Sequence, residues 1–199
     1  GHLQNSLTLD NNVLERLEII LGPGSVIYGS DALGGVMHFY SKNPKLSDND
    51  TLEIQTQLLA RYASANSEKT THLDFNFGLK KFAALSSLSF SDFGDLRQGG
   101  RRDPQYPDFG KRLFYVDRIN DADVVLQNSN PNIQKQSGYK QYNFLQKILY
   151  RQNDVVNHVL NFQYSTSSDI PRYDRLTQIK NDAPQYAEWF YGPQERFFS

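Results

Sequence analysis

The chain alternates apolar and polar residues along most of its length after residue 51. In one segment, Leu73, Phe75, Phe77 and Leu79 occupy every second position between mostly polar neighbours. A period of two is typical of a β-strand with two unlike faces. The alternation predicts five strands, at residues 52–62, 72–79, 84–91, 142–150 and 156–164, and a sixth from about residue 187 to residue 199.

The predicted strands are long, and the links between them alternate in length. Ordinary strands have about 5 to 6 residues, whereas a tilted membrane strand needs about 9 to 11. The links at 80–81 and 152–154 are tight turns, and those at 64–69, 95–138 and 169–185 are longer. Transmembrane β-barrels show this asymmetry, with short turns on the inner side of the membrane and longer loops outside.

The second face of the predicted strands is rich in Gln, Asn and Ser and carries few charges. A soluble sheet would expose Lys and Glu on that face, whereas a barrel lumen suits uncharged hydrogen-bonding groups. Aromatic residues near strand ends fit the interfacial belt of a membrane barrel, although ordinary cross-strand aromatic pairing also explains them. These residues are Tyr62, Phe93, Tyr142, Tyr150, Tyr164, Trp189 and Tyr191.

Composition and motifs remove several classes of function. The chain has no Cys, which excludes disulfide scaffolds, thiolate metal sites and cysteine catalysis. Its 21 Lys and Arg against 22 Asp and Glu exclude a generic nucleic-acid polycation, and no apolar run approaches the about 20 residues of a spanning helix. The four histidines have no zinc-type spacing. Neither a nucleophile elbow nor a complete phosphate loop is present. We therefore expect no metal, no cofactor, no nucleic-acid partner and no enzymatic activity.

The first part of the chain has a different sequence pattern, in which short predicted elements are separated by glycines. The alternation of Leu17, Ile19 and Leu21 predicts a half-buried strand. Gly22-Pro23-Gly24 ends this strand, because proline fixes its φ angle and glycine permits positive φ. We expect a short helix from Ser25 through Leu33, and then a second strand over 36–41. Asp10 and the two asparagines after it are a plausible cap for a short helix before the first strand.

This first part closely resembles the end of the plug domain of TonB-dependent outer-membrane receptors. The resemblance rests on the strand Leu14-Glu15-Arg16-Leu17-Glu18-Ile19 followed by Gly22-Pro23-Gly24-Ser25-Val26-Ile27-Tyr28-Gly29-Ser30-Asp31-Ala32-Leu33-Gly34-Gly35-Val36. One departure is Leu21, where many members have Arg. The residues identified with this plug signature are Glu15, Arg16, Glu18, Gly22, Pro23, Gly24, Ser25, Tyr28, Gly29, Ala32, Gly34 and Gly35.

The resemblance implies a domain organisation and a fold class. Residues 1–44 would be the C-terminal part of a plug, 45–50 a linker, and 51–199 the first strands of a barrel. The expected fold is all-β, a partial antiparallel transmembrane barrel with about six of the about 22 strands of such transporters. The chain starts without Met and stops inside a strand-like pattern, so we interpret it as an internal piece of a longer protein.

The resemblance also implies a function, which is energised uptake of a metal chelate across the outer membrane, with a ferric siderophore or haem as the expected cargo. The partners would be outer-membrane lipid, lipopolysaccharide and TonB, the last through an N-terminal box upstream of Gly1. Arginine forks and aromatic rings suit anionic chelates, so the long links supply candidate ligand contacts, although a solvated loop is an alternative. The candidates are Arg101, Arg102, Tyr106, Arg112, Arg172, Tyr173 and Arg175.

Two other classes of function stay open at this point. The first is a soluble β-rich module that binds a ligand or a carbohydrate. The second is an enzyme, which would need a convergent cluster of titratable groups. A membrane barrel piece would expose sheet edges and an apolar face, and the soluble module would not.

Overall fold

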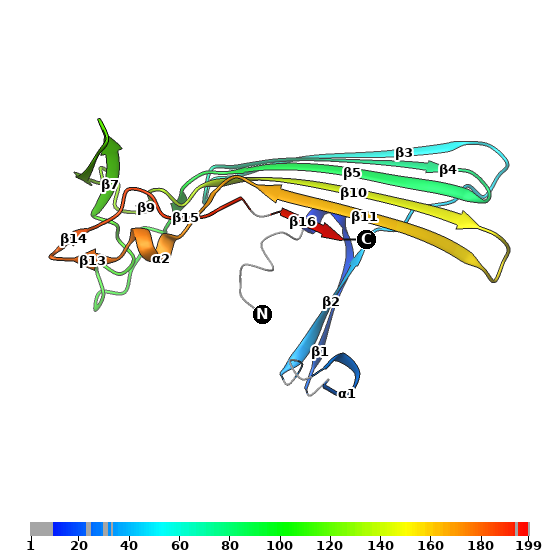
Figure 1. Ribbon diagram of the computed structural model, residues 1–199, viewed down its shortest axis with the longest axis horizontal. Helices are drawn as coiled ribbons and strands as arrows, with labels where there is room; N and C mark the ends of the chain where they lie inside the picture. The colour runs from blue at the N-terminus through cyan, green and yellow to red at the C-terminus, as the bar shows by residue number, and fades with distance from the viewer. Residues whose placement is uncertain (1–9, 23–24, 30–31, 33, 194, 199) are drawn as a thin grey trace.

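The computed structural model describes residues 10–22, 25–29, 32, 34–193 and 195–198, so Pro23 and Gly24 of the plug signature lie outside the described residues. Its largest feature is an antiparallel sheet, here called the wall, in the order β16-β11-β10-β5-β4-β3 (Figure 1). The strands are β3 (Glu53–Ala63), β4 (Glu68–Gly78), β5 (Phe82–Phe93), β10 (Tyr139–Arg151), β11 (Asn157–Ser167) and β16 (Glu195–Phe198). The first five predicted strands are confirmed.

The sixth predicted strand is wrong in its first half. The expected strand over 187–199 is split into β15 (Phe190–Tyr191), which pairs with β12 (Ile170–Pro171), and β16, which pairs with β11. Pro193 has no backbone N–H to donate to a ladder, which favours a break at this point. Trp189 and Tyr191 therefore belong to the long links and not to a belt at the end of a wall strand.

One face of the wall is apolar, because cross-strand pairing aligns its large side chains in rows. A central row contains Leu58, Leu73, Leu88, Phe144, Tyr164 and Phe197. Along β5, Phe82 and Phe90 bound a stretch of about 27 Å at about 3.4 Å per residue, close to the about 25 Å apolar band of outer-membrane barrels. Within this band, the Ser86 hydroxyl donates to Gln146 Oε1 at 2.6 Å, so these two polar side chains are partners of each other.

The opposite face of the wall is polar and largely buried. Side chains that point to it from three strands include Thr70, His72, Asp74, Asn76, Ser87, Ser89, Ser91, Gln141 and Lys147, each no more than 7% exposed. The hairpin of β1 (Leu14–Leu21) and β2 (Gly35–Ser41) contacts this face at its base, where Asp10 bonds to Ser89 and Lys42 bonds to Asp74. A small apolar cluster of Val13, Leu85 and Leu145 lies at this contact.

The β1–β2 hairpin extends away from the wall (Figure 1). Asp10 caps a 3-10 turn, η2 (Asn11–Val13), by accepting from Asn12 N at 2.9 Å, as the sequence predicts. The expected helix after β1 is shorter than predicted, since α1 spans only Ser25–Tyr28. The strand predicted as half-buried is instead largely exposed, and Ile19 and Leu21 are 58% and 84% exposed.

The link between β2 and β3 is fixed to the wall and is not a free tether. Lys45 N donates to Asn76 Oδ1 at 2.8 Å, and Asn76 Nδ2 donates back to Lys45 O at 2.9 Å. Gly78 allows this close approach, because a Cβ there would lie 2.5 Å from Lys45 O. The chain therefore crosses from the hairpin to β3 along one path across the wall.

The two longest links, residues 94–138 and 168–193, form one layer at the same end of the wall, here called the loop layer (Figure 1). Gln136 Nε2 donates to Ala187 O at 3.0 Å, and Arg112 Nη2 donates to Leu176 O at 3.3 Å, so each link is bonded to the other. The layer contains β6 (Leu96–Arg97), β7 (Phe114–Ile119), β8 (Ala122–Gln127), β9 (Ile133–Gln134), β12, α2 (Tyr173–Leu176), β13 (Ile179–Lys180), β14 (Ala183–Pro184) and β15.

No helix within the described residues is long and apolar enough to cross a membrane.

Candidate functional site

Two charged residues of the plug signature, Arg16 and Glu18, contact each other and Tyr40 on the hairpin. Arg16 Nε donates to Glu18 Oε1 at 2.9 Å, its guanidinium lies 4.0 Å from the centre of the Tyr40 ring, and Tyr40 Oη donates to Glu18 Oε2 at 3.1 Å. Contacts with Tyr40 and Glu18 raise the pKa of Arg16 above its ordinary value. Arg16 and Glu18 thus form an ion pair with each other, and Glu15 accepts from Asn43 Nδ2 at 3.5 Å.

The glycines and small residues of the signature shape the end of the hairpin. Gly22, Gly29 and Gly35 adopt positive φ angles, and a Cβ at Gly35 would lie 2.6 Å from Ile20 O. The Tyr28 ring meets the edge of the His38 ring with centres 4.8 Å apart. Ser25 begins α1, and Ala32 and Gly34 follow before β2, with Ala32 buried.

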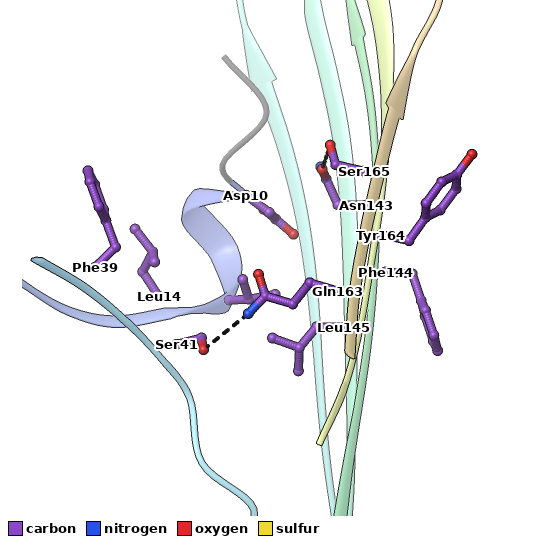
Figure 2. Close-up of a pocket in the computed structure, with 11 residues that line it drawn as sticks. Asp10, Leu14, Phe39, Ser41, Asn143, Phe144, Leu145, Gln163, Tyr164 and Ser165 are labelled. Carbon is purple, nitrogen blue, oxygen red and sulfur yellow. Dashed lines mark hydrogen bonds between the residues drawn. The ribbon is translucent and has the colours of Figure 1, made fainter. Parts of the chain in front are cut away.

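A small seam separates the base of the hairpin from the wall (Figure 2). It encloses about 60 Å³, room for a few waters at about 10–15 Å³ each. In Figure 2, Asp10, Gln163 and Ser41 face one another across it, and Phe144 and Tyr164 point away on the other side of the wall. Gln163 Nε2 donates to Ser41 Oγ at 3.4 Å, so this contact joins the hairpin base to β11.

A larger polar hollow of about 430 Å³ lies on the other side of the hairpin base, against β3 and β4. Lys42 and Lys45 border it from the hairpin side, and Asp74 and Gln57 border it from the wall. Lys147 from β10 also binds the hairpin base, donating to Ser41 O at 3.1 Å and to Asn43 Oδ1 at 3.2 Å. The hairpin is thus held by hydrogen bonds and ion pairs rather than by apolar packing alone.

In the loop layer, the structure brings Arg112 and Tyr173 together from the two long links. The Arg112 guanidinium lies 5.1 Å from the centre of the Tyr173 ring. It is 5% exposed and donates to the carbonyls of Lys135 and Leu176 and to Gln136 Oε1. Burial raises the pKa of Tyr173, and Arg112 opposes that change. Arg112 therefore fastens the two links and has little donor capacity left for a ligand.

The other candidates of the first link are not gathered around Arg112. Arg102 donates to Phe109 O at 2.8 Å and to Asn132 Oδ1 at 2.6 Å, which orders its own loop. Arg101 is exposed, and Tyr106 is 63% exposed. These last two face solvent and keep their functional groups available.

Arg172 and Arg175 form a ledge with aromatic rings in the second link. The Arg172 guanidinium lies 5.0 Å from the Tyr191 ring centre, and that of Arg175 lies 5.7 Å from the Trp189 ring centre. Asp174 pairs with Arg172 at 2.8 Å; this pairing lowers the pKa of the Asp174 carboxyl and raises that of Arg172. The ledge thus combines flat rings with forked cations.

A hollow of about 440 Å³ opens between the two links. Leu113, Phe114 and Ile179 line it with exposed apolar surface, and Lys111 and Tyr173 contribute polar groups. Apolar hollows with a few polar groups are the usual form of small-molecule sites. Within the described residues, no group of three or more His, Cys, Asp or Glu side chains is placed to hold a metal ion.

Several residues that organise the loop layer were missed by sequence reasoning. Gln134 accepts from the Tyr173 hydroxyl, Gln136 bridges Val116 O and Ala187 O, and Asn128 is buried and donates to Arg112 O. Such uncharged residues give no sequence signal, because their role depends on a partner about 15 to 50 positions away, a separation that no local pattern encodes.

Comparison with known proteins relates the chain to outer-membrane receptors of iron chelates. It is 32% identical over 108 residues to the hemin receptor of Yersinia enterocolitica and 35% identical over 104 residues to that of Yersinia pestis, with 49% of this chain and 14% of each receptor covered. It is 43% identical over 44 residues to the ferrichrome outer membrane transporter/phage receptor of Escherichia coli strain K12, covering 22% of this chain and 6% of that protein.

These relatives confirm the resemblance to outer-membrane receptors that the first part of the sequence indicates, and the all-β antiparallel structure agrees with it. The matched region is a small part of each relative's length. No family model and no solved structure matches the chain.

Proposed function

We infer that the chain is part of a TonB-dependent outer-membrane receptor that takes up an iron chelate, either haem or a ferric siderophore. The observation that carries this inference is the homology to hemin and ferrichrome receptors. The relatives are receptors and a transporter, so we propose a binding and transport role without covalent chemistry. Energy for uptake would come from TonB, which would act on a segment outside this chain.

The inside-out distribution of side chains in the wall supports an outer-membrane location. Leu58, Leu88 and Leu160 are 69%, 53% and 65% exposed on the apolar face, whereas His72 and Ser87 on the polar face are nearly fully buried. Large exposed apolar surfaces are costly in water and favourable in lipid. This distribution disfavours a soluble binding module.

The three regions of the structure take distinct roles in this proposal. The hairpin and its base, up to residue 44, are the end of a plug, residues 45–50 link it to the wall, and the wall from residue 51 is the start of the barrel. The loop layer lies at the outer end, where Lys69 and Lys140 at the rim of the apolar face meet lipopolysaccharide phosphates. The chelate contacts the exposed groups of the loop layer.

Among the candidate ligand residues, the structure favours some over others. Arg101 and Tyr106 are exposed, and the ledge of Arg172 and Arg175 presents cations over aromatic rings. A flat anionic chelate would stack on such rings and pair with the guanidinium groups. Arg112 would act indirectly, by holding the two links in register.

The test is growth on defined iron sources. The intact receptor is expressed in a host that lacks its own chelate receptors, with hemin or ferrichrome as the sole iron source. We expect growth on one of these chelates and no growth when TonB is deleted. Growth on neither chelate, with the receptor correctly inserted in the outer membrane, would contradict the iron-chelate function, and growth without TonB would contradict the energy source.

Three charge-removing variants separate ligand contact from a general effect of net charge. Arg172→Gln and Arg175→Gln remove cations of the ledge, whereas Lys180→Gln removes an exposed cation elsewhere in the same link. We expect the first two to weaken chelate binding to the intact receptor severalfold and the third to leave it unchanged. An equal effect of all three would show that only net charge matters.

A further inference from the structure

Both ends of the β1–β2 hairpin are attached to the same group of wall side chains. Asp10 precedes η2 and β1, and Lys42 directly follows β2. Asp10 Oδ2 accepts from the Ser89 hydroxyl at 2.5 Å, and Lys42 Nζ donates to Asp74 Oδ2 at 2.6 Å. Ser89 and Asp74 lie on neighbouring strands, and His72 lies between them.

His72 connects the two attachment points. Its Nδ1 atom lies 2.6 Å from Ser89 Oγ. Its Nε2 atom lies 2.9 Å from Asp74 Oδ1, a contact at ion-pair distance rather than a well-aligned hydrogen bond. Asp10, Ser89, His72, Asp74 and Lys42 thus form one continuous chain of contacts, here called the relay, and His72 is only 1% exposed.

The hydrogens of the relay can be counted. The Ser89 hydroxyl gives its only hydrogen to Asp10, so the contact between His72 and Ser89 needs a hydrogen on Nδ1. The opposite ring nitrogen faces a carboxylate oxygen of Asp74, which already accepts from the Ser87 hydroxyl. Both contacts of the ring are favourable only when both nitrogens carry hydrogen, which is the imidazolium form.

The surrounding charges agree with this form. Asp10 faces His72 through Ser89 from the hairpin base, Asp74 faces it from its own strand, and Lys42 reaches Asp74 from the end of β2. The neighbours of His72 across the ladders are Leu59 on β3 and Ser89 on β5, neither of which is charged. With an imidazolium, two carboxylates and two cations balance, whereas a neutral His72 leaves a net negative charge buried.

We propose that the relay is a proton-dependent latch that holds both ends of the hairpin on the wall. With His72 protonated, one ring joins the anchor of Asp10 to the anchor of Lys42, and the hairpin base stays seated. When His72 loses its proton, the Nε2 lone pair faces the Asp74 carboxylate, and both anchors weaken together. The role of the latch in gating rests on the proposed function, because only in a plugged receptor does the seating of the hairpin control passage.

The test uses a single engineered cysteine as a reporter, since the chain has no Cys of its own. Val13 is 6% exposed at the hairpin base, against Leu85 and Leu145. The Val13→Cys variant of the intact receptor is placed in lipid nanodiscs, and any other cysteines are replaced. A maleimide reagent then reacts with the introduced thiol only when the hairpin base lifts from the wall. Dividing its rate by that of Val155→Cys, where Val155 is 91% exposed, removes the pH dependence of thiol chemistry.

We expect the normalised rate to be about tenfold higher at about pH 8.5 than at about pH 5.5, the amount expected for loss of one charge-assisted hydrogen bond. His72→Gln keeps a polar side chain without a titrating proton, and should give the high rate at every pH. His158→Gln, at an exposed histidine near a tight turn, should behave like the parent.

A flat pH profile in the parent would overturn the latch, as would a His72→Gln variant that keeps the parent's profile. Lys42→Gln provides a second check, because it removes one anchor without touching the ring, and should raise the labelling rate at low pH. None of these readouts measures transport. A labelling result as expected, together with failed uptake on hemin and ferrichrome, would leave the latch standing and refute only the proposed function.

Discussion

The wall and the loop layer bury opposite kinds of side chain. In the wall, the most buried side chains include the polar His72 and Ser87, while Leu58 and Leu88 on the apolar face are exposed. In the loop layer, Val116 and Leu176 are each 1% exposed, as in an ordinary water-soluble core. One chain thus buries polar side chains in one region and apolar side chains in the other. The boundary lies where β5 and β11 end and where β10 begins. This difference indicates that the two regions face different solvents, which are lipid at the apolar face of the wall and water around the loops.

The loop layer should respond to a core truncation as soluble proteins do. Leu176→Ala removes a buried side chain of α2 and should lower the free energy of local opening by about 2–5 kcal/mol. Hydrogen exchange of residues 168–193 in the intact receptor measures this change. Leu58→Ala, at a 69% exposed position of the wall, is the matched control and should change the free energy of local opening little. Equal losses of the free energy of local opening in the two variants would contradict the difference between the two regions.

The wall should respond to charge according to the face that receives it. Leu58→Arg places a cation in the central apolar row and should destabilise the inserted receptor by about 2–4 kcal/mol. Gln57→Arg changes the adjacent residue of β3, which is exposed on the polar face, and should cost far less. Urea unfolding in bilayers compares the two variants. A greater loss for Gln57→Arg would reverse the assignment of the faces.

The wall was predictable from the sequence because its signal is local. Strand periodicity depends only on which neighbours are apolar, and the tight turns at 80–81 and 152–154 separate the strands clearly. The largest error in the wall, the split of the sixth strand, arose where Trp189 and Tyr191 continue an apolar pattern inside a loop. Pairing of β15 with β12 decides that segment, and pairing partners are not written in local alternation.

The loop layer and the relay were harder to foresee for the same reason. Arginines such as Arg112 were recognisable as candidates, but the sequence does not tell a ligand contact from an internal fastener. The spacing of the histidines gives no sign of the contacts of His72, because Asp10 and Ser89 are distant from it in sequence. Only the register of β4 with β5, and the return of the hairpin base to the wall, bring these residues together.

The fastening role of Arg112 gives a smaller, more specific prediction within the loop layer. Arg112→Lys keeps the charge but loses the fork that reaches Gln136 and Leu176. We expect local opening of the layer to become easier by about 1–3 kcal/mol, measured by hydrogen exchange of residues 112–136 and 173–187. Arg101→Lys at an exposed position is the control. If Arg112→Lys changed chelate affinity while leaving exchange unchanged, Arg112 would be a ligand contact instead.

The smallest expected effect concerns pH, and it separates the two regions once more. The hydrogen bond from Arg172 lowers the pKa of Asp174 below its ordinary value, about 3.9 for aspartate. A lowered folded-state pKa means that the pair stabilises the loop above that ordinary value and loses its effect as the pH falls through the lower one. Hydrogen exchange of residues 172–178, corrected for intrinsic rates, should therefore stay flat from about pH 8 to about pH 5, whereas the labelling rate of Val13→Cys is expected to change with pH. Asp174→Asn should loosen these residues slightly and equally at every pH in this range, because it removes the charge without adding a titration. A step near neutral pH in the loop exchange of the parent would mean that the loop layer senses the same proton as the wall, and that the two regions are coupled rather than merely adjacent.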